Sequence, residues 1–151
     1  MNNTIKKIAA YAMLACASGL FVACSDEANR APEFASVNIT GATYAKDFEL
    51  TDHHGKTRRL TDFSGKVIVL FFGYTQCPDV CPTSTSELAQ IKKDLGADGE
   101  RVQVLFVSVD PERDTPEMLK EYMGSFDPTF LALHTNKEKL AEVAKAFKIY
   151  Y

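Results

Sequence analysis

Three short runs of apolar residues stand out along the chain, at 67–72, 102–109 and 130–133. Each run is bounded by polar residues, glycine or proline, and the first two are apolar at nearly every position. Continuous apolar runs of this length are typical of strands in a parallel sheet that has helices on both faces. We therefore expect three buried strands, with residues 67–72 as the first central strand.

Segments with helical spacing follow the three runs. A Ser84…Glu87 capping box predicts a helix over 84–95 that Gly96 ends, and Thr115 before Pro116 predicts the start of a second helix. The pattern Thr135-x-x-Glu138 predicts a third. The apolar residues expected to face the core are Leu88, Ile91 and Leu95 in the first helix, Leu119, Tyr122, Met123 and Phe126 in the second, and Leu140, Val143, Ala144 and Phe147 in the third.

A β-hairpin is predicted before the first of these strands. Residues 45–50 and 57–60 alternate weakly, and the turn signal Asp52-His53-His54-Gly55 separates them. Adjacent histidines can hold a metal ion, but at the tip of a turn they are more often solvated. We interpret His53 and His54 as solvated side chains.

The predicted order, a hairpin followed by alternating strands and helices, indicates an α/β domain with mostly parallel strands. A strand, a loop with two cysteines and then a helix favour a thioredoxin-like fold. Such a fold continues with a closing hairpin and a last helix, and the sequence stops at Tyr151. We expect the C-terminal hairpin and last helix to be missing, and the chain to be a fragment.

Two cysteines, Cys77 and Cys81, lie where the first strand gives way to the first helix. Three intervening residues place the two sulfur atoms about one helical turn apart. The N-terminus of a helix favours the thiolate, which is the form that binds metal or attacks a disulfide. A reactive or metal-binding pair is therefore favoured over a structural disulfide, which usually joins distant segments.

Other candidate ligands are better explained by the fold. Met118 and Met123 could offer thioethers to copper, but at this spacing we interpret both as core residues. His134 follows the third apolar run and is interpreted as an ordinary residue at the end of a strand.

The N-terminal segment has the layout of a bacterial export signal. Lys6 and Lys7 precede a run of apolar and small residues that ends in Ala23-Cys24. We expect residues 1–23 to be a lipoprotein-type signal peptide, with a lipid on Cys24, 24–38 to be a flexible tether, and 39–151 to be the folded domain. An uncleaved anchor and an ordinary cleaved leader are the alternatives, since Phe21 departs from the usual aliphatic residue.

All three interpretations place the domain outside the cytoplasm. With the lipoprotein-type signal, we expect it in the bacterial cell envelope, attached to the membrane by the lipid on Cys24. The compartment is oxidising, so the cysteine pair is expected to be a disulfide unless it is reduced or metallated. The 151 residues are 46% apolar, enough for one domain with a real core. The formal charge of −3 argues against a nucleic-acid partner.

The motifs of the domain resemble those of the SCO/SenC/PrrC proteins. The resemblance runs from about Ala45 to Tyr151 and depends on three blocks of residues. These blocks are Phe71-Phe72-Gly73-Tyr74-Thr75, Cys77-Pro78-Asp79-Val80-Cys81-Pro82, and Ser108-Val109-Asp110-Pro111-Glu112-Arg113-Asp114-Thr115-Pro116.

The resemblance implies a membrane-tethered, thioredoxin-like copper metallochaperone that delivers copper to the cytochrome c oxidase copper centre. Cys77 and Cys81 match two copper ligands of the family, and the third, a histidine, is expected beyond Tyr151. None of this chain's three histidines matches that position. Asp110 is a candidate residue near the copper loop. The implied partners are the copper-site subunit of the oxidase and other periplasmic copper or thiol-redox proteins.

Three other functions stay open at this point. The cysteines can act as a thiol–disulfide oxidoreductase that keeps a partner's copper-site cysteines reduced, so whether the protein is an enzyme is undecided. Cys81-Pro82-Thr83 has a faint similarity to peroxiredoxins, but the nearby carboxylate of Asp79 disfavours a nucleophilic thiolate. A purely structural lipoprotein is the remaining alternative.

Overall fold

The structure, a computed structural model, describes residues 35–151. The predicted signal peptide, the lipid site at Cys24 and most of the tether lie outside these residues. Gly41–Tyr151 form a unit of their own, and the description below concerns this unit. None of the helices within 35–151 has both the length and the apolar character needed to span a bilayer.

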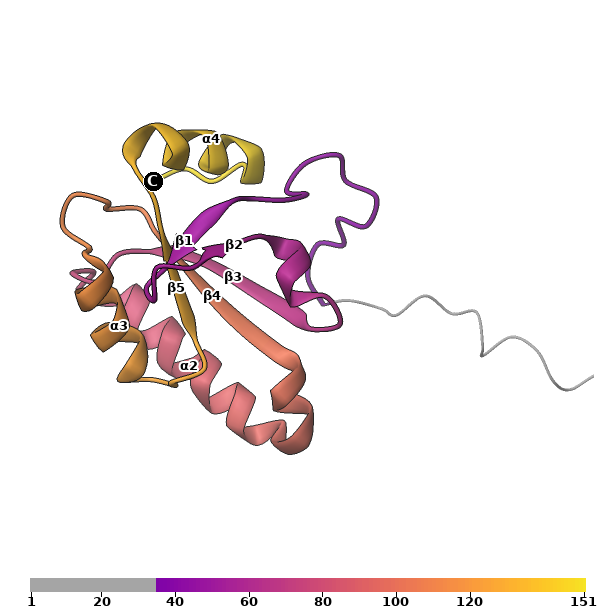
Figure 1. The fold of residues 1–151 in the computed structure, drawn as a ribbon. Helices are drawn as coiled ribbons and strands as arrows, with labels where there is room; N and C mark the ends of the chain where they lie inside the picture. The colour runs from indigo at the N-terminus through magenta and orange to yellow at the C-terminus, as the bar shows by residue number, and fades with distance from the viewer. Residues whose placement is uncertain (1–34) are drawn as a thin grey trace, which may run out of the picture. The chain divides into compact units, whose positions relative to one another are not determined.

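The centre of the unit is a five-stranded sheet in the order β2-β1-β5-β4-β3 (Figure 1). Neighbouring strands β3, β4 and β5 run parallel, with Leu70 opposite Leu105 and Leu105 opposite Leu131. Strands β1 and β2 form the predicted antiparallel hairpin, and β1 also pairs with β5 in antiparallel fashion. The bounds are Leu50–Asp52 for β1, Thr57–Arg58 for β2, Val67–Gly73 for β3, Val102–Ser108 for β4 and Leu131–His134 for β5.

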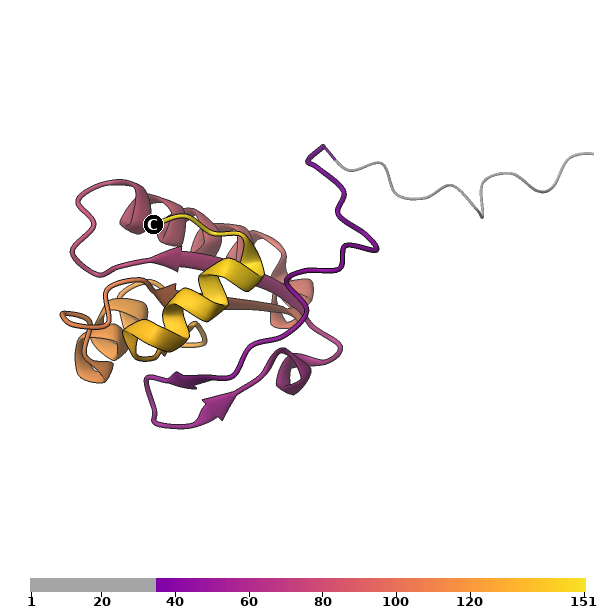
Figure 2. The ribbon, with the colours of Figure 1, turned by 90° about the horizontal axis from the view of Figure 1, so that it is seen from above.

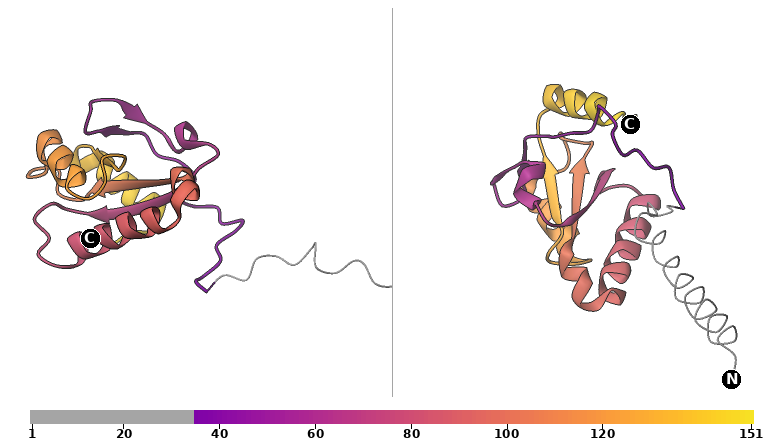
Figure 3. Two further views of the ribbon diagram at one scale, coloured as in Figure 1. Left: turned by 90° about the horizontal axis from the view of Figure 1, so that it is seen from below. Right: turned by 90° about the vertical axis from the view of Figure 1, so that its right-hand side faces the viewer.

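Helices cover both faces of this sheet. α2 (Val80–Asp94) and α3 (Pro116–Gly124) lie on one face, and α4 (Lys137–Phe147) lies across the other (Figures 1, 2 and 3). Two short 3-10 helices, η1 (Leu60–Phe63) and η2 (Gly96–Arg101), precede β3 and β4. The arrangement confirms the α/β class and the expected order of elements.

Each face of the sheet has its own apolar cluster. Leu119 and Met123 of α3 pack on one face with Phe106, while Val143 of α4 packs on the other with Leu105. Residues of β3 alternate between the two clusters, as the two-residue period of a strand requires. Ile68, Leu70 and Phe72 contact the α4 side, and Val69 and Phe71 contact the α2–α3 side.

The expected central position of β3 is wrong. β3 pairs with β4 alone and lies at one end of the sheet within the described residues. Its side chains are half-buried, and Val67 is 58% exposed. An apolar run on the chain indicates that both faces of a strand are covered, but it carries no information on lateral neighbours.

The predicted start of the first helix is also wrong. α2 begins at Val80, four residues before Ser84, so Cys81 is a helical residue and the expected capping box lies inside the helix. Pro82 is tolerated there because the first turn of a helix has no internal acceptor for its N–H groups. The last helix, in turn, is capped by Asn136, which accepts a bond from the Lys139 N–H at 2.8 Å.

The buried face of α2 also differs from the predicted one. The helix buries Cys81, Thr85 and Lys92, whereas Ile91 and Leu95 are 53% and 45% exposed, against expectation. Leu88 packs against the core as predicted. In α3, Met123 is a core residue, but Met118 is 39% exposed and does not belong to the core.

Candidate metal and thiol site

The loop that carries Cys77 begins at a glycine in a crowded position. A Cβ atom at Gly73 would lie 2.9 Å from Cε2 of Phe106 and 3.0 Å from Cε1 of Phe71. The carbonyl of Gly73 accepts a bond from the Val109 N–H at 2.8 Å, which keeps the end of β3 beside β4. The loop then turns back on itself, since the Cys77 N–H donates to the Tyr74 carbonyl at 3.2 Å.

The two cysteines meet at the N-terminus of α2. Cys77 lies in the loop and is partly exposed, while Cys81, the second residue of the helix, is only 6% exposed. The backbone N–H of Cys81 donates a hydrogen bond to Sγ of Cys77 at 3.3 Å. Both side chains are free thiols, and Thr85 Oγ1 donates to the Cys81 carbonyl at 2.7 Å.

This geometry separates the acidities of the two thiols. The pKa of Cys77 is lowered, first by a side-chain hydrogen bond from Cys81 and then by backbone N–H groups of Cys81, Asp79 and Val80. Burial is the main cause that raises the pKa of Cys81, and the bond to Cys77 adds to it. Cys77 is therefore the sulfur that becomes a thiolate first.

A buried carboxylate fastens the loop from outside. Asp114, 3% exposed, lies between β4 and α3. Its Oδ1 accepts from Thr75 Oγ1 at 2.6 Å, its Oδ2 accepts from Ser108 Oγ at 2.6 Å, and the Thr75 N–H lies 3.2 Å from both oxygens. Thr75 stands two residues before Cys77, so Asp114 joins the cysteine loop to the end of β4.

The aspartate singled out in the sequence, Asp110, is placed differently. Its carboxylate pairs with Arg113, three residues along the same segment. Its N–H donates to Ser108 Oγ at 3.1 Å, which makes it a neighbour of the Asp114 network. The carboxylate that contacts the cysteine loop is that of Asp114, which stands in the same Asp-Pro block as Asp110.

A tyrosine hydroxyl is buried on the α3 side of the site. Tyr122 packs between Phe106 and Phe126, with ring centroids 5.6 and 5.0 Å away. Its hydroxyl is buried, and although the Thr85 side chain lies close enough to lower its pKa, no hydrogen bond of normal geometry reaches it among the described residues. Burial is the main cause that raises its pKa to about 12, and the nearby Cys81 and Cys77 thiols add to the shift.

The three histidines do not join the cysteines. His53 is 8% exposed, against the expectation of a solvated side chain, because its Nδ1 accepts the Ala132 N–H at 3.0 Å. His54 is exposed and stacks on His53, with ring centroids 4.1 Å apart. His134 ends β5 as predicted, with Nε2 buried and unpartnered. Within residues 35–151, no three His, Cys, Asp or Glu side chains are grouped so as to hold a metal ion.

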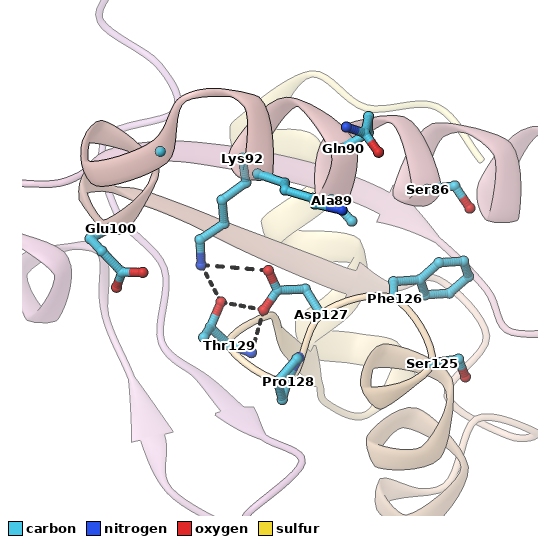
Figure 4. A pocket seen from close by; sticks show the side chains of 12 residues that line it. Ser86, Ala89, Gln90, Lys92, Glu100, Ser125, Phe126, Asp127, Pro128 and Thr129 are labelled. Carbon is cyan, nitrogen blue, oxygen red and sulfur yellow. Dashed lines mark hydrogen bonds and ion pairs between the residues drawn. The ribbon is translucent and has the colours of Figure 1, made fainter.

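A cavity of about 550 Å³ between α2 and the segment after α3 contains neither cysteine (Figure 4). At its base, Lys92 Nζ contacts Thr129 Oγ1 and lies 3.8 Å from Oδ2 of Asp127. The Lys92 side chain spans from the C-terminal half of α2 to the loop before β5 (Figure 4). The Lys92 contacts join α2 to the loop before β5, and the cavity is separate from the thiol site.

Comparison with known families and chains gives one consistent answer. The SCO1/SenC family model matches residues 37–151. A mitochondrial SCO2 homologue of Bos taurus is 41% identical over 107 residues, which cover 70% of this chain and 40% of the relative. An SCO2-like protein of Rickettsia felis is 33% identical over 152 residues, which cover 99% of this chain and 74% of the relative.

Solved structures agree with the sequence comparison. Copper-bound ScoI of Bradyrhizobium japonicum is 43% identical with a TM-score of 0.65, over 69% of this chain and 66% of that one. BsSco, described as having a disulfide switch and as a member of the Sco family of cytochrome c oxidase assembly proteins, is 27% identical with a TM-score of 0.60, over 72% and 66%. The expected thioredoxin-like architecture is confirmed by these neighbours.

Proposed function

Because the chain belongs to the SCO1/SenC family, we propose that it binds copper through Cys77 and Cys81 and passes it to the copper centre of cytochrome c oxidase. Two relatives support the two parts of this proposal. The ScoI neighbour was solved with copper bound, and BsSco is described within a family of oxidase assembly proteins.

One observation carries the proposal, the contact of the Cys77 sulfur with the N-terminus of the helix that holds Cys81. Thiolates are soft ligands that select Cu(I), and the backbone N–H groups at this terminus favour the thiolate. Cys77 is reachable from solvent, while Cys81 is buried behind it. A copper ion arriving from solvent would meet Cys77 first and Cys81 second.

The donor set fits Cu(I) better than Cu(II). Two thiolates satisfy the preference of Cu(I) for soft ligands, whereas Cu(II) prefers a tetragonal set that includes nitrogen or oxygen. His53 is occupied by the Ala132 N–H, and the described residues hold no cluster of three ligands. We propose that the third ligand is a histidine beyond Tyr151.

A titration with Cu(I) under a competing chelator tests the copper site. The reduced protein is used with Cys16→Ser and Cys24→Ser, so that only the loop thiols remain. We expect one Cu(I) per chain, and a loss of affinity of at least about a hundredfold in Cys77→Ser and in Cys81→Ser, since each removes one of two ligands. Full affinity in either variant would rule out the paired site.

A second function, thiol–disulfide exchange, is favoured by the contrast between the exposed Cys77 and the buried Cys81. In that reaction the Cys77 thiolate attacks a partner's disulfide and releases one partner sulfur as a thiolate. Cys81 then displaces the other, so the partner gains a dithiol and this chain gains a Cys77–Cys81 disulfide. Reduction of a peptide disulfide by the metal-free protein, at a rate abolished by Cys77→Ser, is the corresponding test.

Membrane attachment in the bacterial cell envelope is the proposed setting, through a lipid on Cys24 that follows the basic and apolar N-terminal segment. Other periplasmic copper or thiol-redox proteins are the proposed further partners. Fatty-acid labelling in cells is expected to stop in Cys24→Ser. Labelling that continues in this variant would show that the lipid is attached to another residue, with Cys16 as the candidate.

A further inference from the structure

We propose that Asp114 is a positioning residue for the cysteine pair. Through its contact with Thr75, Asp114 holds the loop that carries Cys77 in place. Asp114 touches neither sulfur in the hydrogen-bond network described above, so its effect is carried by the loop. This role rests on the copper and thiol function proposed above. Its test measures the oxidation of the two thiols in the absence of copper.

The carboxylate of Asp114 is itself held from two directions. Its own N–H donates to the Asp110 carbonyl at 3.0 Å, and Ser108 Oγ, at the end of β4, donates to Oδ2 at 2.6 Å. Ser108 is 1% exposed and belongs to a strand paired on both sides. The carboxylate therefore has a fixed position relative to the sheet.

Thr75 attaches the loop to this fixed point. Its hydroxyl donates to Oδ1 of Asp114 at 2.6 Å, and its N–H points between the two carboxylate oxygens. Hydrogen bonds of this kind, with an ionised acceptor, are about twice as strong as neutral ones. Residues 74–76 also form hydrogen bonds within their own loop and with α2. Among the described residues, their hydrogen bonds to any other part of the fold are all made to Asp114.

The consequence concerns how often the two sulfurs meet. Cys81 is fixed by α2, whereas Cys77 lies on a loop without regular secondary structure between β3 and the helix. Anchoring the loop at Thr75 shortens the freely moving segment and lowers the entropy lost when Cys77 approaches Cys81. Anchoring therefore raises the effective concentration of one thiol at the other, which favours any state that joins both sulfurs.

The equilibrium between dithiol and disulfide in glutathione mixtures measures this effective concentration. The protein carries Cys16→Ser and Cys24→Ser, and the pair is quantified by mass after rapid alkylation. Thr75→Val removes the hydroxyl and keeps the shape and the N–H, while Thr75→Ser keeps the hydroxyl. We expect Thr75→Val to lower the equilibrium constant for disulfide formation about tenfold, as the loss of one charge-assisted hydrogen bond implies, and Thr75→Ser to restore it.

A matched control exists elsewhere in the chain. Thr129 makes the same contact to another aspartate, with its hydroxyl 2.6 Å and its N–H 2.8 Å from Oδ1 of Asp127. Thr129→Val removes an equivalent bond, together with the contact from Lys92, at a place remote from the cysteines, and is expected to leave the equilibrium constant unchanged. Asp114→Asn is expected to act like Thr75→Val, and where it fails to fold, the pair of Thr75 variants decides the question.

Two results would overturn the proposal. An equilibrium constant in Thr75→Val equal to that of the parent would show that the loop needs no anchor. An equal fall in Thr75→Val and Thr129→Val would show a general loss of stability. Cu(I) affinity, measured separately, distinguishes this failure from that of the copper proposal, because a parent protein that binds no Cu(I) can still show the thiol effect.

Discussion

The sulfur of Cys77 accepts a hydrogen bond from the backbone N–H of Cys81 at the first turn of α2. The backbone N–H groups of Asp79 and Val80 also lower the pKa of this thiol. The pKa of the Cys81 thiol is raised instead, because burial and the neighbouring sulfur both oppose its ionisation. Two thiols four residues apart therefore differ in chemistry because they occupy different positions relative to one helix.

This difference predicts the order of alkylation in the metal-free, reduced protein. The lowered pKa of Cys77 gives it a thiolate at a lower pH than an ordinary cysteine, while the raised pKa of Cys81 delays its reaction. We expect iodoacetamide to modify Cys77 at least about tenfold faster at pH 7, since the thiolate is the reacting species. Peptide mapping by mass spectrometry measures both rates, and equal rates would contradict the assigned asymmetry.

Removal of the Tyr122 hydroxyl is expected to stabilise the fold. The hydroxyl is buried, and its contact with the Thr85 side chain lies outside hydrogen-bond geometry, so Tyr122→Phe removes a desolvated group and keeps the ring packing. The expected gain is about 1 kcal/mol in the free energy of unfolding, measured with denaturant. Tyr150→Phe, at a tyrosine that is 98% exposed, is the control and is expected to leave the free energy of unfolding unchanged. A loss of stability in Tyr122→Phe would show that the hydroxyl is hydrogen-bonded in solution.

Asp52 is expected to make the fold sensitive to acid. Burial raises its pKa, but hydrogen bonds from the Lys56 N–H, the Arg58 side chain and the His54 N–H outweigh burial and leave the pKa below its usual value. Because the pKa is lower in the folded state than in the unfolded state, the ionised carboxylate stabilises the fold at every pH above the unfolded-state pKa. This stabilisation is lost as the pH falls through the folded-state pKa.

Asp52→Asn is therefore expected to cost about 1–3 kcal/mol at pH 7, and much less once the pH lies below the folded pKa, where the wild-type carboxyl is protonated and uncharged like the amide. Urea unfolding at a series of pH values measures the difference. Asp98→Asn removes an aspartate that is 77% exposed and is expected to change the stability by less than about 0.5 kcal/mol at every pH. A cost for Asp52→Asn that is already lost above the usual pKa of 3.8 would contradict the lowered pKa.

Gly73 is expected to tolerate no side chain. In Gly73→Ala the new Cβ would press on the rings of Phe106 and Phe71, and both rings belong to or pack on one core cluster. The expected loss is about 1–3 kcal/mol, as for other overpacked cores. Gly124→Ala is the matched control, because a Cβ there meets nothing within 4 Å at the end of α3, and a small gain is expected. Equal stability of the two variants would contradict the crowding at Gly73.

The sequence was sufficient for the order of the elements because each is defined locally. The apolar runs, Thr115 before Pro116 and the spacing of Leu140, Val143 and Ala144 all depend on neighbours within a few positions. Those elements are confirmed. The start of α2 was misplaced because Ser84 and Glu87 have the residue types of a capping box, while the actual N-cap, Asp79, makes no side-chain capping bond.

The site was only partly predictable for a similar reason. Cys77 and Cys81 are close in sequence, and the first turn of α2 directs the Cys81 N–H at the Cys77 sulfur. Asp114 reaches Thr75 across 39 positions, and no local pattern reports that contact. The same holds for the burial of His53, which depends on the Ala132 N–H of a strand 79 positions away.

Strand β3 offers a last consequence, in the exchange of its amide hydrogens with solvent. The Gly73 carbonyl points toward β4, so by the two-residue period Phe71 and Val69 also direct their backbone groups to β4. The amides of Ile68, Leu70 and Phe72 then face the open edge, where no strand pairs with β3 among the described residues. One strand would therefore hold two populations of amides in alternation, the inner ones protected by the sheet and the outer ones exchanging with deuterium far sooner.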